Sequence, residues 1–153
     1  MTVAEPWWLY LDFDGVLNSD PFLRRQRNVL PQSEHRLFDV ENLLALDSLC
    51  EALPVASIVI TSTWREGRSV QLLQELLAGE GFRHGSLVSG VTPFGKTRAA
   101  EILSHARSHA VGRYFVLDDM NLHPLVPPVF FQTSAATGLT RDLVDRVLGT
   151  LQG

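Results

Sequence analysis

The strongest structural signal in the chain is the stretch Leu9-Tyr10-Leu11-Asp12-Phe13-Asp14-Gly15-Val16-Leu17-Asn18. Its apolar beginning predicts a buried strand, which ends in two aspartates one residue apart and then a glycine. Alternate side chains of a strand share a face, so the carboxylates of Asp12 and Asp14 are expected to start on the same side. Gly15 lets the chain turn away and brings backbone groups close to whatever the carboxylates hold. Two neighbouring like charges are unfavourable unless a cation or a chemical task offsets them.

Length and composition predict one globular domain over 1–153. The 153 residues are enough to bury a hydrophobic core. The net charge of −4 excludes a surface that is basic throughout, although it is compatible with a local basic patch. Cys50 is the only cysteine, which excludes an internal disulfide and indicates a reducing compartment. The sequence has no signal-peptide pattern and no run of about 20 apolar residues, so we expect a cytoplasmic protein without a membrane partner.

Strands and helices alternate along the rest of the chain. Further strands are predicted from short apolar runs at 55–60, 86–89, 114–117 and 129–132. Helices are predicted from apolar residues at helical spacing over 40–53, 70–77, 96–110 and 141–151. The polar stretch 18–38 contains Pro21 and Pro31 and is expected to be irregular. The alternation predicts an α/β, Rossmann-like fold of three layers, with a central parallel sheet of about five strands.

Polar side chains follow three of the predicted strands. They are Asp12 and Asp14, Thr61 and Ser62, and Asp118 and Asp119. Each pair alone is typical of a turn or a solvated loop, but parallel strands bring their carboxyl ends to one edge, where ligands bind. Nothing structural requires acidic residues there. Clustered carboxylates favour a hard cation that prefers oxygen ligands, most simply Mg²⁺.

Four motifs resemble those of the haloacid dehalogenase (HAD) superfamily, and together they extend over nearly the whole chain. These motifs are Asp12-Phe13-Asp14-Gly15-Val16, Thr61, a basic residue at Lys96 or Arg98, and Asp118-Asp119. The chain is also similar to the small HAD domains of Swiss-army-knife RNA-repair proteins, over the stretches 12–18, 61–65, 98–102, 116–119 and 137–140. The resemblance implies a HAD-like fold with a minimal cap or none.

The resemblance also implies a phosphatase mechanism. Asp12 would attack phosphorus and form an aspartyl-phosphate, while Asp14 would protonate the leaving group and later accept a proton from water. Mg²⁺ would be held by Asp12 and Asp118, with help from Asp119 and from the backbone carbonyl of Asp14. The acidic residue at position 14 is absent from the dehalogenases of the superfamily, so dehalogenation is disfavoured.

The remaining site residues are expected to bind phosphate. Thr61, together with the Ser62 amide, would hydrogen-bond phosphoryl oxygens. Lys96 and Arg98 are both candidates for the basic residue beside the nucleophile, and the sequence favours neither. Arg65 is a candidate for contact with a phosphate or with the substrate backbone, because its fork of donors suits phosphate oxygens.

The intervals between the motifs bear on the substrate. They leave room for a minimal flap only, which favours a macromolecule such as a polynucleotide with a terminal phosphate, or a cap supplied by an oligomeric partner. Arginines at 24, 25 and 27 either clamp a polyanion or belong to a solvated face. The alternatives are a small-metabolite phosphatase, a phosphotransferase, and a catalytically silent HAD-fold module that binds or regulates. The sequence indicates neither an oligomeric state nor a preference for 3′ or 5′ ends.

Overall fold

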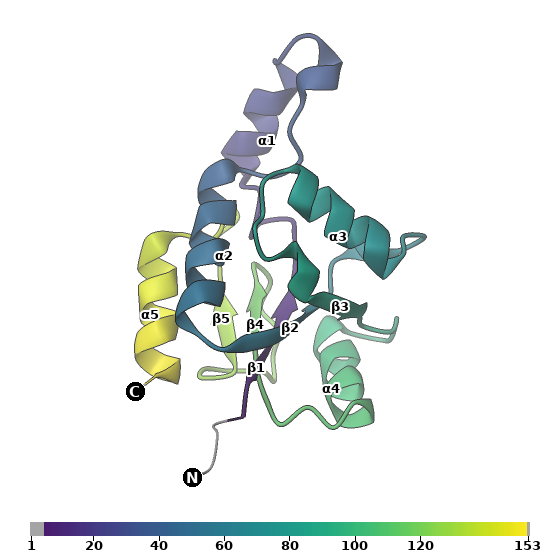
Figure 1. Cartoon of the computed structure of the whole chain (residues 1–153), viewed down its shortest axis with the longest axis vertical. Coiled ribbons are helices and arrows are strands. Elements are labelled where there is room, and N and C mark those ends of the chain that lie inside the picture. The colour runs from purple at the N-terminus through teal and green to yellow at the C-terminus, as the bar shows by residue number, and fades with distance from the viewer. Residues whose placement is uncertain (1–4, 153) are drawn as a thin grey trace.

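A central parallel sheet organises the computed structural model, which describes residues 5–152 (Figure 1). Its strands are β1 (Trp7–Leu11), β2 (Val55–Ile60), β3 (Val88–Val91), β4 (Arg113–Asp118) and β5 (Phe130–Gln132). Their order across the sheet is β3-β2-β1-β4-β5, and every neighbouring pair is parallel. The end of β1 is level with its neighbours, since Leu11 pairs with both Ile60 and Leu117. The predicted α/β fold is therefore confirmed, and the carboxyl ends of β1, β2 and β4 lie side by side.

Helices cover both faces of the sheet. Those on one face are α2 (Val40–Ala52), α3 (Val70–Gly79) and α5 (Arg141–Leu151), and α4 (Arg98–Ser108) lies on the other; α1 (Asp20–Arg27) projects beyond the sheet. Leu9 and Leu11 of β1 point into a core formed with α2, α3 and α5, whereas Tyr10 points into the core on the α4 side. None of the helices in residues 5–152 is both long enough and apolar enough to cross a membrane.

Side-chain caps set where the helices begin. Asp39 and Thr140 precede α2 and α5, and their side chains accept hydrogen bonds from backbone amides in the first turn. The helix predicted over 96–110 is shorter at both ends, since α4 spans Arg98–Ser108. It begins at Arg98 because the Thr97 hydroxyl accepts a hydrogen bond from the Ala100 amide and caps the helix. The strand predicted at 86–89 lies two residues later, because Gly85–Leu87 forms a 3₁₀ turn.

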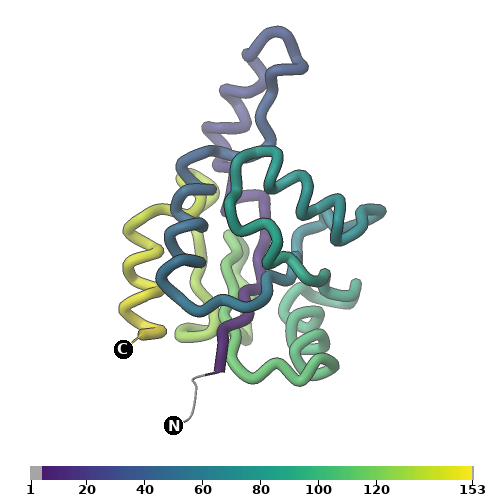
Figure 2. The backbone as a smooth tube through the Cα atoms, in the orientation of Figure 1, coloured from purple at the N-terminus to yellow at the C-terminus, as the bar shows by residue number. Residues whose placement is uncertain are grey.

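The prediction that 18–38 is irregular was wrong for Asp20–Arg27, which form the helix α1. Ser19 caps α1 by accepting a hydrogen bond from the Phe22 amide (3.2 Å), and Pro21 occupies the first turn. Proline is tolerated there because the amide that it lacks would have no partner within the helix. A 3₁₀ turn follows at Gln32–Glu34, and the segment projects beyond the carboxyl edge of the sheet, where Figure 2 shows it at the top.

Candidate active site

Three residues at the carboxyl ends of neighbouring strands form the floor of the candidate site. The Asp12 amide donates to the Leu117 carbonyl (3.1 Å), and the Thr61 amide donates to the Leu11 carbonyl (2.9 Å). The ladder thus continues one residue past β1 and β2, where it meets Asp118 at the end of β4. Asp12, Thr61 and Asp118 are all buried. As expected from the sequence, the sheet brings together side chains that are far apart in the chain.

The three aspartates Asp12, Asp118 and Asp119 form a carboxylate cluster, with one oxygen of each within 4.8 Å of the others. Arg98 Nη1 lies 3.0 Å from Asp118 Oδ2 and 3.3 Å from Asp12 Oδ1. The Met120 amide donates to the other Asp118 oxygen at 2.9 Å. One guanidinium thus contacts two of the three acidic groups.

Burial dominates the electrostatics of the carboxylate cluster. Burial and the neighbouring charge of Asp118 together outweigh the opposing charge of Arg98 and raise the pKa of Asp12 to about 8. The pKa of Asp119 is also raised, first by burial and then by Asp118. A divalent cation would hold all three groups in their ionised form, and hard carboxylate oxygens are the ligands that Mg²⁺ prefers. The donor set of the carboxylate cluster therefore fits Mg²⁺.

Asp14 lies outside the carboxylate cluster and exposes its side chain. Its Oδ1 accepts a hydrogen bond from Asn18 Nδ2 (3.1 Å), and its Oδ2 accepts one from Trp64 Nε1 (3.2 Å). The Trp64 ring packs against Phe13 and Phe38. Asn18 and Trp64 stand inside the stretches 12–18 and 61–65, but the sequence does not predict their contacts with Asp14, because these depend on the tertiary structure.

Gly15 makes the turn between the two acidic positions possible. Its φ of +80° is a conformation that favours glycine, and a Cβ there would overlap the Asp119 carboxylate. The Gly15 amide donates to the Asn18 carbonyl (2.9 Å), and its carbonyl accepts from Thr133 Oγ1 (2.8 Å). Both backbone groups are bonded within the protein. In the structure Gly15 provides the turn and the space for Asp119, and the expected substrate contact at Gly15 stays a prediction.

Thr61 and Ser62 differ in how their hydroxyl groups are used. Ser62 Oγ accepts from the Trp64 amide (3.2 Å) and caps the 3₁₀ turn Thr63–Arg65. Thr61 Oγ1 is buried and has no hydrogen-bond partner among the described residues. A buried hydroxyl without a partner is unfavourable, so a ligand oxygen at this position would satisfy it.

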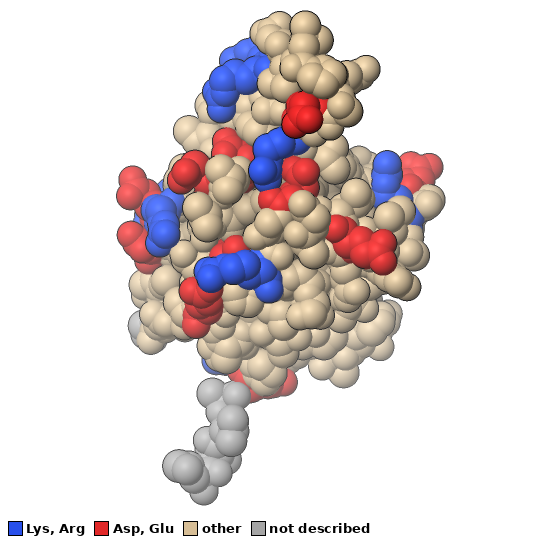
Figure 3. Space-filling model, turned by 45° about the horizontal axis from the view of Figure 1, so that its top comes forward, with Lys and Arg blue, Asp and Glu red and all other residues tan. Residues whose placement is uncertain are grey.

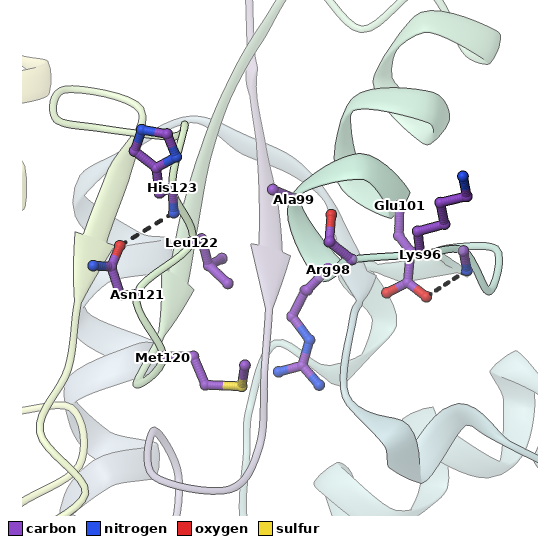
Figure 4. Close-up of a pocket in the computed structure, with 10 residues that line it drawn as sticks. Lys96, Arg98, Ala99, Glu101, Met120, Asn121, Leu122 and His123 are labelled. Atoms are coloured by element: carbon purple, nitrogen blue, oxygen red, sulfur yellow. Dashed lines mark hydrogen bonds between the residues drawn. The ribbon is translucent and has the colours of Figure 1, made fainter.

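A cavity of about 450 Å³ adjoins the carboxylate cluster and contains both candidates for the basic residue (Figure 4). Arg98 extends from α4 toward Met120 and contacts two members of the cluster. Lys96 is exposed, points in a different direction, and makes no ion pair with a carboxylate in residues 5–152. The structure therefore brings Arg98, and not Lys96, to the acidic residues.

Arg65, a candidate for contact with a phosphate or with the substrate backbone, directs its guanidinium into the protein. Its side chain is only 2% exposed and donates five hydrogen bonds within the protein. The acceptors are the carbonyls of Thr61, Ser62, Thr92 and Pro93 and the carboxylate of Glu101. Glu101 also accepts from the Gly95 amide (2.8 Å). Arg65 thus connects the loop after β2 to the loop before α4. The sequence does not predict this role, because the acceptors at 92, 93 and 101 are far from Arg65 along the chain.

Comparison with known proteins gives one match. The model of a family described as the HAD domain in Swiss Army Knife RNA repair proteins matches residues 8–144. The matched range includes all the site residues from Asp12 to Asp119. No curated protein and no solved structure matches the chain.

Proposed function

Since the chain belongs to the family of HAD domains in Swiss Army Knife RNA repair proteins, we propose that it is a phosphatase that hydrolyses phosphomonoesters through Asp12. Family membership supports a HAD-type phosphatase or hydrolase in general. The observation that carries the specific proposal is the buried Asp12 carboxylate in contact with Arg98 and within the carboxylate cluster. In this proposal, Asp12 attacks phosphorus, the ester bond breaks, and the aspartyl-phosphate formed is then hydrolysed by water.

Asp14 is the proposed general acid and base. It would protonate the leaving alkoxide in the first step and accept a proton from water in the second. Its side chain follows Asp12 by two residues, is open to solvent, and is oriented by Asn18 and Trp64. This combination suits a group that must exchange protons, while the buried Asp12 suits a nucleophile.

Asp12, Asp118 and Asp119 are the proposed ligands of Mg²⁺, together with the backbone carbonyl of Asp14. When bound, the ion would neutralise charge so that a carboxylate can approach an anionic phosphate. Arg98 contributes a second positive charge beside Asp12. Thr61 Oγ1, which has no partner among the described residues, would donate to a phosphoryl oxygen and satisfy its own hydrogen-bonding capacity.

The proposed substrate is a polynucleotide with a terminal phosphate. Between β1 and α2 the chain adds only α1 and a 3₁₀ turn, and between β2 and α4 it adds α3, two 3₁₀ turns and β3. These segments are too short to form a cap domain that encloses a small metabolite. An open site admits the end of a long molecule. A small-metabolite phosphatase is the second candidate for turnover, and a silent binding module is the alternative without turnover.

The test is phosphate release from p-nitrophenyl phosphate and from 3′- and 5′-phosphorylated oligonucleotides, each with Mg²⁺ and with EDTA. We expect release that needs Mg²⁺ and that falls by roughly 10³-fold or more in Asp12→Asn, because the nucleophile is lost. Asp145→Asn, an exposed change of the same kind on α5, is the matched control and should behave as wild type.

Other outcomes would select the alternatives. No release from any substrate would overturn the phosphatase proposal in favour of a binding module. Release that requires an added acceptor alcohol would identify a phosphotransferase. Sugar phosphates hydrolysed far better than oligonucleotide ends would refute the polynucleotide substrate and leave the aspartyl-phosphate chemistry in place.

A further inference from the structure

The segment 20–38, called the arm below, projects from the edge of the sheet at which the candidate site lies (Figures 1 and 2). It consists of α1, the 3₁₀ turn Gln32–Glu34 and the connecting loops. Both ends of the arm are anchored. The Asp20 amide donates to the Ala135 carbonyl (2.8 Å), and the Asp39 amide, just after the arm, donates to the Leu17 carbonyl (2.8 Å). The arm is therefore held in place at both ends by backbone hydrogen bonds and lies beside the candidate site.

The arm is basic in a chain that is acidic overall. It carries four arginines and two acidic residues, whereas the whole chain has a net charge of −4. Arg24, Arg25 and Arg27 on α1 are exposed, and none makes an ion pair with a carboxylate of the described residues. Figure 3 shows lysine or arginine side chains on the projecting part of the molecule, seen with the carboxyl edge turned forward. The arm thus presents positive charge that the protein itself does not neutralise.

Helix stability alone does not account for these arginines. Basic residues in a last turn do favour a helix by interacting with its dipole, by roughly 0.3–1 kcal/mol. However, α2, α3 and α5 end without any basic residue in the last turn. The α1 helix has three, although it spans eight residues and buries only Phe22. Arg24 and Arg27 lie on the side of α1 away from Phe22, where they face solvent.

The arm is also connected directly to the general acid. Asn18, which donates to Asp14, is followed by Ser19, the cap of α1. At the other end of the arm, Phe38 packs against Trp64, which also donates to Asp14. The leaving group of a substrate at Asp12 must lie next to Asp14, and a long leaving group would continue from there along the arm.

We propose that the arm binds the backbone phosphates of a polynucleotide whose terminal phosphate is at Asp12. This inference rests on the proposed phosphatase function and names the part of the protein that selects the substrate class. The planar guanidinium donates two parallel hydrogen bonds to phosphate oxygens, so arginine suits repeated backbone phosphates. Arg24, Arg25 and Arg27 contact these phosphates and act on binding, not on bond cleavage.

The test compares the triple variant Arg24→Gln/Arg25→Gln/Arg27→Gln with a control that changes the same charge elsewhere. The control removes three other exposed arginines, at 107, 141 and 146 on α4 and α5. Substrates are p-nitrophenyl phosphate and phosphorylated RNA oligonucleotides of increasing length. Binding of the same oligonucleotides to Asp12→Asn protein, with and without the triple change, is measured by fluorescence anisotropy.

We expect the arm variant to keep wild-type hydrolysis of p-nitrophenyl phosphate and to show a raised KM for oligonucleotides. Loss of three phosphate contacts should reduce the slope of log affinity against log salt by about 2, at about 0.7 per contact with a single strand. From 50 to 200 mM salt, wild-type affinity should therefore fall by about 20-fold more than that of the arm variant. The control variant should keep the wild-type slope.

An equal effect in the control variant would overturn the proposal, because it would assign the binding to net charge and not to the arm. Unchanged anisotropy and KM in the arm variant would also overturn it. Hydrolysis of p-nitrophenyl phosphate without hydrolysis or binding of oligonucleotides would reject the polynucleotide substrate and leave the phosphatase proposal intact. If no substrate is hydrolysed, the phosphatase proposal fails, and the anisotropy comparison still decides whether the arm binds polynucleotide.

Discussion

Replacing Arg65 by methionine should destabilise the fold more than any substitution of an exposed arginine. Methionine keeps much of the side-chain volume but donates no hydrogen bond. The change would leave the buried Glu101 carboxylate without its cationic partner, which lies 3.1 Å away, and would remove a donor from four backbone carbonyls. Both loops that flank the candidate site depend on these bonds.

The expected loss in the free energy of unfolding is about 4 kcal/mol. Breaking a buried ion pair by removing one partner typically costs about 3–5 kcal/mol, because the other charge stays buried and uncompensated. Both side chains are shielded here, at 2% and 9% exposure, so solvent screens the pair little. Because Glu101 keeps its bond from the Gly95 amide, we place the value near the middle of that range. Domains are typically stable by about 5–15 kcal/mol, so this loss is large but leaves a measurable transition.

Urea unfolding followed by tryptophan fluorescence would measure the change. Glu101→Gln, which removes the charge and keeps an acceptor, should cost less than Arg65→Met. Glu51→Gln is the matched control on the exposed pair with Arg83, at 50% and 64% exposure, and should change stability by at most about 1 kcal/mol. In the double variant Arg65→Met/Glu101→Met no lone charge remains, so its loss should be smaller than the sum of the single losses by about 1–3 kcal/mol.

A loss in Arg65→Met no greater than that in Glu51→Gln would refute this reasoning. It would mean that the guanidinium is not a structural tie between the two loops. Arg65 would then again be a candidate for direct contact with the substrate.

Two further changes test the turn at the site and the α4 layer. Gly15→Ala should destabilise the protein and weaken Mg²⁺ binding in calorimetric titration, because the new Cβ displaces Asp119. Gly67→Ala is the control, since Gly67 has a φ of +70° and open space around it. It should lose only about 1–2 kcal/mol of stability, from backbone strain. Equal Mg²⁺ affinity in both variants would contradict this. Burial, with the nearby charge of His109, lowers the pKa of His105 to about 4, against about 6.5 when unfolded. The unfolded chain binds the proton more tightly, so stability should be retained above pH 6.5 and fall by up to about 3 kcal/mol toward pH 4. In urea unfolding curves, His105→Gln should remove this loss of stability at low pH. His109→Gln, a change at an exposed position, should leave most of the loss in place. An identical pH dependence of stability in wild type and His105→Gln would refute the reasoning.

Local sequence was sufficient to predict the fold class and the floor of the candidate site. Apolar runs have the length and composition of buried strands, and their alternation with amphipathic segments indicates a parallel sheet. The polar residues that follow the runs are then placed at one edge by topology alone. This is why the sequence alone groups Thr61 with Asp12, Asp118 and Asp119, and why the three carboxylates indicate a hard cation.

The helix α1 shows the limit of pattern reading within a single segment. Its signals were present, since Ser19 is a good cap and Pro21 is allowed in a first turn. With only Phe22 buried, however, no repeated apolar stripe marks the helix in sequence. Prolines that begin a helix and prolines that interrupt one look the same when periodicity is absent.

Sequence by itself determined which chemical groups this protein has and along which edge they gather, because residue type and strand alternation are local properties. Only the tertiary structure decided which of the suitable groups lie beside the carboxylates. Arg98 reaches Asp12 and Lys96 does not, because the cap at Thr97 fixes where α4 begins and which side chains face the sheet. Arg65 is used inside the protein because folding brings Glu101, 36 residues away, into contact with it. Burial and direction depend on the packing of distant segments, and no local pattern encodes them.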